Sequence, residues 1–121
     1  MRVFLITILA MVLHILFGWA WTAVAALAGG IWTAQVGRCM WMGAVGVGLE
    51  WAGWIAFSFI TAAPATQQML DTLGGLMGNS PAALVVGATV CIGVLLGALG
   101  GLVGGTLGRL IDLRPSPFRA T

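Results

Sequence analysis

Two ionisable side chains, His14 and Glu50, interrupt long apolar stretches of this sequence and are its main candidates for chemistry. Glu50 is one of three acidic residues in the chain, and His14 is the only histidine. Placing a comparable charged side chain at the centre of a bilayer costs about 2.5 to 3.5 kcal/mol on insertion scales. Such a residue therefore has a polar partner or a function, such as proton transfer or contact with a cofactor.

The positions of His14 and Glu50 predict that the two side chains meet. Each lies near the middle of its apolar stretch, so both reach the bilayer midplane when the two stretches form antiparallel transmembrane helices. A hydrogen bond or ion pair between them then satisfies both groups. We expect this buried polar pair, and the alternatives are a proton or ion site and contact with a partner subunit or cofactor.

The residues around His14 also suit an axial ligand to a flat macrocycle. Ala10 precedes it by four residues and Gly18 follows it by four, with Trp19 and Trp21 beyond. This piece resembles the Ala-xxx-His and downstream tryptophan pattern of bacterial light-harvesting polypeptides. The resemblance implies a haem-type or chlorophyll-type tetrapyrrole on His14, although those polypeptides are single-span and the remainder of this chain departs from them. No other feature of the sequence requires a cofactor.

Enzymatic chemistry and metal binding have no comparable support. With one histidine, three serines and no lysine, the chain shows no catalytic residue set, and its glycines do not form a nucleotide-binding loop. Cys39, Met40 and Met42 are soft ligands of the kind that bind Cu(I), but their position at a helix end favours interfacial packing. We therefore expect neither an enzyme nor a metal protein.

The composition predicts an all-α integral membrane protein. Of its 121 residues, 60% are hydrophobic and 7% are charged, with mean hydropathy +1.09, whereas soluble domains carry about 25% charged residues. A transmembrane helix needs about 20 apolar residues, and three segments satisfy this length, at about 3–28, 39–63 and 81–108. The first exceeds the apolar core of a signal peptide and is expected to be retained. The net charge of +2 gives no indication of a nucleic-acid partner.

A shorter amphipathic helix is expected at about 65–78, lying in the membrane interface. Its apolar residues recur at helical spacing, and its polar residues lie on the opposite face. Gly29 and Gly30 are expected to end the first helix and to begin a tight hairpin. Residues 1–110 then form one three-helix transmembrane domain, and 111–121, with two prolines, form an extended cytoplasmic tail.

The arginines predict the orientation of these helices. With three crossings Arg2 lies on one side of the membrane, and the other basic residues lie on the opposite side: Arg38, Arg109, Arg114 and Arg119. The positive-inside rule then places the N-terminus outside and the C-terminus in the cytoplasm. Because every basic residue is arginine, as suits a GC-rich prokaryotic genome, we expect the inner (plasma) membrane of a prokaryote.

Glycines at helical spacing predict faces on which helices pack closely. Small residues four apart let helix backbones approach in lipid, where no hydrophobic effect drives helices together. Glycines form two neighbouring tracks of this kind in segment 81–108. In segment 39–63, glycines share a face with Glu50. The first track is Gly93, Gly97, Gly101 and Gly105, the second is Gly100, Gly104 and Gly108, and those beside Glu50 are Gly43, Gly46 and Gly53.

These features favour a non-catalytic accessory subunit of a larger prokaryotic membrane complex, of an energy-converting or transport type. Its glycine faces would pack against other integral membrane subunits, among membrane lipids, since they exceed what a lone three-helix bundle uses. One alternative is a homo-oligomeric pore-former, because the layout resembles that of class I phage holins. A second alternative is a cofactor-binding subunit that uses His14.

Overall fold

The computed structural model describes residues 2–33 and 35–112, which lie in helices or in the short turns between them. The elements are α1 (Arg2–Phe17), the 3-10 helix η1 (Trp19–Trp21), α2 (Thr22–Thr33), α3 (Val36–Leu76) and α4 (Ala82–Asp112). The predicted all-helical class is confirmed for this part of the chain. Two helices, α3 and α4, are long and apolar enough to cross a membrane. Residues 113–121 of the predicted tail, with Arg114 and Arg119, lie outside the described residues.

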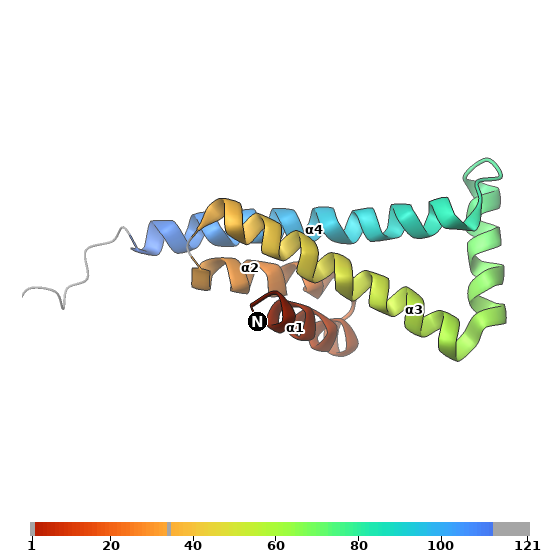
Figure 1. Cartoon of the computed structure of the whole chain (residues 1–121), viewed down its shortest axis with the longest axis horizontal. Helices are drawn as coiled ribbons and strands as arrows, with labels where there is room; N and C mark the ends of the chain where they lie inside the picture. Colours follow the sequence, from red (N-terminus) through yellow and green to blue (C-terminus); the bar gives the residue numbers. More distant parts are fainter. Residues whose placement is uncertain (1, 34, 113–121) are drawn as a thin grey trace, which may run out of the picture.

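The single helix predicted at 3–28 is wrong, because the chain reverses after Gly18. This residue has φ 92° and ψ 174°, a conformation essentially restricted to glycine. One turn of 3-10 helix follows, and the Thr22 hydroxyl donates to the Trp19 carbonyl at 2.8 Å. Helix α2 then runs back beside α1, so the two form a hairpin that packs next to α3 and α4 (Figure 1).

Gly18→Ala is expected to lower the free energy of unfolding by about 1 to 3 kcal/mol, because alanine is strained at this φ and ψ. No neighbouring atom lies within 4 Å of a Cβ at position 18, so the loss comes from the backbone alone. Gly37→Ala is the matched control, since position 37 has the same open space within helix α3. Thermal unfolding in detergent measures both variants, and equal stabilities would contradict the hairpin.

Gly29 and Gly30 do not end a helix, contrary to the prediction, because both lie inside α2 at helix contacts. A Cβ on Gly29 would come within 2.8 Å of Ile6 Cδ1, and one on Gly30 within 2.7 Å of the Gly105 nitrogen. The two glycines therefore let α2 approach α1 on one face and α4 on another.

Helix α3 has two arms that meet at a kink. Ala62 has non-helical φ −147° and ψ 49°, and it is followed by Pro64, whose ring and missing N–H disrupt a regular helix. The Thr66 hydroxyl donates to the Ser58 carbonyl across the bend at 3.1 Å. Beyond the kink, the second arm runs across the long axis of the molecule to the start of α4 (Figure 1). The two arms correspond to the second predicted transmembrane segment and the predicted amphipathic helix.

Helix α4 is the centre of the packing. The turn before it contains Gly78 and Asn79, both with positive φ, at 76° and 61°. Helix α4 continues past the predicted end at residue 108 as far as Asp112. It contacts α3 in antiparallel orientation and α2 in parallel orientation, whereas α1 lies outside, against α2 and α3.

Candidate functional site

The His14 and Glu50 side chains form the one buried ionisable pair among the described residues. The imidazole Nδ1–H of His14 donates to Glu50 Oε1 at 2.7 Å. The Glu50 side chain is 0% exposed, whereas that of His14 is 27% exposed. The contact therefore offsets part of the cost of burying the carboxylate, and His14 is the member through which the pair is reached from outside.

Helix α1 lies against α3 in parallel orientation, so the predicted antiparallel order is wrong. The Thr7 hydroxyl donates to the Gly46 carbonyl at 3.1 Å, and a Cβ on Gly46 would lie 2.9 Å from Ile6 Cγ2. Because Gly46 has no side chain, α1 comes close enough for His14 to reach Glu50 one turn further along α3.

Aromatic rings pack on one side of the pair. The ring centroids of His14 and Trp54 are 5.2 Å apart with planes tilted by 39°. Trp54 in turn meets Phe57 edge-on, at 5.6 Å and 86°. Trp54 follows Glu50 by one helical turn and shares its face of α3, so these contacts restrict the orientation of the imidazole beside the carboxylate.

Three buried polar atoms on α3 have no hydrogen-bond partner within the described part of the chain: Glu50 Oε2, Trp51 Nε1 and Trp54 Nε1. A buried polar group left unpaired costs about 1 to 3 kcal/mol. Oε2 can therefore accept a proton, or a hydrogen bond from a further donor. A carboxylate on one ring nitrogen is also the usual surrounding of a metal-ligating histidine, and it leaves Nε2 of His14 as the ligand atom.

The glycine tracks of α4 face this chain's own helices. The track against α3 is Gly93, Gly97, Gly101 and Gly105, and the track against α2 is Gly100, Gly104 and Gly108. Gly97 meets the Gly43 carbonyl, so the backbones of α3 and α4 touch directly. Both tracks are filled within one molecule, and the expected surplus of close-packing surface on α4 is not found.

The three glycines predicted to share one face of α3 do not do so. Gly43 packs on α4 and Gly46 packs on α1, whereas no atom lies within 4 Å of a Cβ on Gly53. Gly53 is exposed and takes no part in these contacts. Gly48 was not predicted, yet a Cβ there would lie 2.7 Å from Val94 Cγ2. The sequence signal for this contact was the small size of Gly48, which lies in the same glycine-rich run as Gly43 and Gly46.

Cys39 and Cys91 are free thiols in different surroundings. The Cys39 thiol is buried and donates to the Gly30 carbonyl at 3.5 Å, whereas Cys91 is exposed. Within residues 2–33 and 35–112, no group of three or more His, Cys, Asp or Glu side chains is placed to hold a metal ion.

The turn between α1 and α2 lies level with the middle of α4, although η1 itself packs on α1 and α2. A Cβ on Gly100 would lie 2.6 Å from the Ala23 carbonyl oxygen, and the turn precedes Ala23 by about one helical turn. It therefore lies near the centre of the 31-residue α4 (Figure 1). Trp19 is 60% exposed and Trp21 is 44% exposed.

Comparison of the chain with protein-family models, with curated proteins and with solved structures gives no match. Its function is therefore inferred from three physical features: the exposed hairpin turn, the His14–Glu50 pair and the internally filled glycine tracks. The hairpin turn is the feature that was not predicted from the sequence.

Proposed function

We propose that this chain is a small, non-catalytic integral membrane protein and a subunit of a larger prokaryotic membrane complex, of an energy-converting or transport type. Membrane insertion is supported by large apolar side chains that no helix covers, among them Phe4, Ile15, Leu95 and Leu99, each more than 60% exposed. Soluble monomers rarely expose contiguous apolar patches larger than a few hundred Å². In a bilayer these side chains face hydrocarbon.

In the topology that we propose, α4 and the first arm of α3 cross the bilayer, and the α1–α2 hairpin enters and leaves on one side. With 16 and 12 residues, α1 and α2 are too short to cross a hydrocarbon core of about 30 Å. The hairpin brings the chain at Arg2 toward the side where Arg38 and Arg109 lie. By the positive-inside rule that side is cytoplasmic. The N-terminus is then cytoplasmic as well, which replaces the outside location deduced from three crossings.

The second arm of α3 is assigned to the outer membrane interface. It runs across the axis of α4 (Figure 1), as an interfacial helix does. Leu70 is buried toward the bundle, while Gln67 and Asp71 are exposed and bond to each other at 3.2 Å. Its polar side chains then face water and its apolar side chains face lipid or the bundle.

Epitope tags at the two ends of the chain are expected to lie in the same compartment. Antibodies should label both tags only after spheroplasts are permeabilised, because the re-entrant hairpin returns the N-terminus to the cytoplasmic side. A tag inserted between Gly78 and Asn79, in the turn before α4, is the outside control and should be labelled in intact spheroplasts. Labelling of the N-terminal tag in intact cells would show a third crossing and contradict this topology.

The observation that carries the subunit proposal is the position of the hairpin turn. Non-helical backbone at bilayer depth is tolerated where protein covers it or where it lines a water-filled cavity. Each polar backbone group left uncovered in hydrocarbon costs several kcal/mol. Because Trp19 and Trp21 are exposed at this depth, we assign a neighbouring protein chain as the cover of the turn.

The glycine tracks act inside the subunit. They hold α4 against α2 and α3, and so keep the hairpin at a fixed depth beside α4. The contact with other subunits is therefore assigned to the hairpin turn, not to the glycine faces that were expected to make it. The role proposed for the chain in the complex is structural, with no catalytic group of its own.

Purification from native membranes in a mild detergent, through a C-terminal tag, tests this function. We expect foreign subunits in fixed stoichiometry with the tagged chain, measured by native mass. A homo-oligomer without other subunits would contradict the proposal and favour the pore-former.

Ligation of a tetrapyrrole through His14 is a second candidate, favoured by one observation. Glu50 accepts the hydrogen bond from Nδ1 of the imidazole, which leaves Nε2 as the ligand atom of an oriented histidine. On the Gly18 side, no atom of a neighbouring residue lies within 4 Å of a Cβ, so there is space for a macrocycle. Ala10 was expected to provide such space on the other side, but it is fully buried by the chain itself. An absorption band that copurifies with the protein and is lost in His14→Leu supports this role, and a colourless native complex excludes it.

A further inference from the structure

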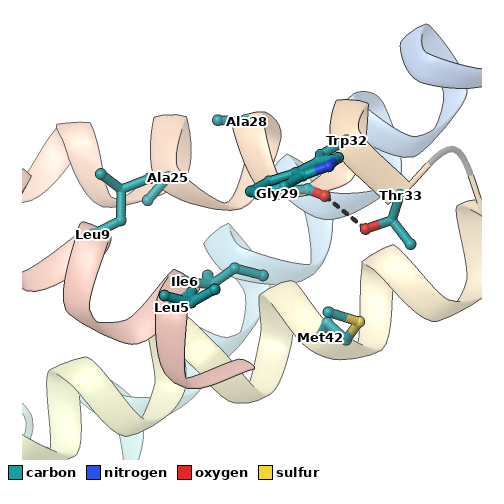
Figure 2. Close-up of a pocket in the computed structure, with 9 residues that line it drawn as sticks. All are labelled: Leu5, Ile6, Leu9, Ala25, Ala28, Gly29, Trp32, Thr33 and Met42. Atoms are coloured by element: carbon teal, nitrogen blue, oxygen red, sulfur yellow. Dashed lines mark hydrogen bonds between the residues drawn. The ribbon is translucent and has the colours of Figure 1, made fainter. Parts of the chain in front are cut away.

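An apolar groove of about 280 Å³ lies between the α1–α2 hairpin and the beginning of α3 (Figure 2). Its walls include Ile6 of α1, Ala28 of α2 and Met42 of α3. The Thr33 hydroxyl in its lining already donates to the Gly29 carbonyl at 2.9 Å, so its proton is not available to a ligand. The groove therefore offers contact surface for an aliphatic group and no charged side chain in its lining.

The size of the groove suits part of a single hydrocarbon chain. Its volume lies just below the range for small-molecule sites, about 300 to 1,000 Å³. The α2 side is lined in part by the small residues Ala25, Ala28 and Gly29. A straight alkyl chain can lie against these small residues, whereas a charged headgroup finds no charged partner in the lining.

Arg38 places a positive charge at the α3 end of the groove. It precedes Met42 by four residues and so lies on the same face of α3, one turn nearer the proposed cytoplasmic surface. Arg38 is exposed and has no salt-bridge partner among the described residues. Trp32, also in the groove lining, is 85% exposed, as suits an aromatic ring at the headgroup boundary.

We infer that this groove binds one acyl chain of an anionic phospholipid from the cytoplasmic leaflet, with the lipid phosphate at Arg38. The inference rests on the proposed membrane topology, which places the groove in that leaflet. Anionic lipids are attracted to arginines at the cytoplasmic surface, and basic sites between helices bind their headgroups. The bound chain fills the space between the hairpin and α3 that the protein leaves open.

Native mass spectrometry tests the inference with the full-length protein released from vesicles of equal parts phosphatidylglycerol and phosphatidylcholine. The wild type should retain one phosphatidylglycerol in preference to phosphatidylcholine. Ala28→Phe fills the groove at an exposed position and should reduce lipid retention about tenfold. Leu9→Trp fills the groove from α1 and should act in the same way. Arg38→Gln should remove the preference for phosphatidylglycerol.

Val103→Phe is the matched control, because Val103 is 44% exposed on α4 and lies outside the groove lining. It should retain lipid like the wild type. Wild-type retention in both groove-filling variants, with unchanged helical circular dichroism, would overturn the site. Equal retention of the two lipids by the wild type would overturn the anionic assignment. Partner subunits are tested separately, by native mass of the complex purified from native membranes, so loss of the lipid site is distinguishable from failure of the subunit proposal.

Discussion

Replacing Gly97 with leucine is expected to force α3 and α4 apart and to lower the free energy of unfolding by about 3 kcal/mol or more. A Cβ at position 97 would overlap the Gly43 carbonyl oxygen and lie 2.7 Å from its carbonyl carbon. Both of those atoms belong to backbone, which cannot rotate away as a side chain does. Thermal unfolding followed by circular dichroism in detergent measures the loss.

Gly87→Leu is the matched control for Gly97→Leu in the same helix. No neighbouring atom lies within 4 Å of a Cβ at position 87, so leucine fits there without displacing another helix. Leucine is also a better helix former than glycine, by up to about 1 kcal/mol. The control should therefore be as stable as the wild type or more stable. If both variants lost the same stability, α3 and α4 would not be in backbone contact at Gly97.

His14→Leu is expected to destabilise the protein by about 3 to 5 kcal/mol, because it leaves the fully buried Glu50 carboxylate without its partner. Glu50→Leu should cost less, since the His14 side chain is 27% exposed whereas the Glu50 side chain is fully buried. The double variant H14L/E50L should recover most of the loss, because a well-packed apolar pair often replaces a buried ion pair without cost. A double-mutant cycle on thermal unfolding gives the coupling energy of the pair.

The double variant also separates a structural role of the pair from a chemical one. If the pair only holds α1 against α3, H14L/E50L will fold, assemble with its partners and support growth as the wild type does. A double variant that folds and assembles but leaves the complex inactive assigns proton transfer or cofactor ligation to the site. Wild-type stability in His14→Leu would contradict the structural role of the contact.

Hydropathy predicted the helical class and the two long helices, because a hydrocarbon core selects long apolar runs. It could not distinguish one straight helix at 3–28 from the two shorter helices of a hairpin, since both have the same apolar composition. The difference lies in the backbone of Gly18. Its φ of 92° is not indicated by the type of any neighbouring residue. The reversal of the first predicted helix, and the new position of the N-terminus, both follow from that one residue.

The proximity of His14 and Glu50 was predicted from their depths, but on an incorrect helix direction. In the structure His14 lies in the last turn of α1, close to the reversal at Gly18, and it meets Glu50 with α1 parallel to α3. Glycine spacing likewise predicted close packing without identifying the partner helix. The small residues Ala23, Ala26 and Gly30 recur at helical spacing in α2, and they were the signal that the second track of α4 packs within the chain.

The most direct measurement of the central claim is photo-crosslinking from the hairpin turn in native membranes. A photoreactive amino acid at position 21, where Trp21 is 44% exposed, should form an adduct with a foreign membrane protein. The same group at position 53, where Gly53 is exposed and no atom lies within 4 Å of a Cβ, is the comparison site. The account predicts a discrete hetero-adduct from position 21, stronger than any from position 53. Adducts with lipid alone, or with a second copy of this chain alone, would contradict it.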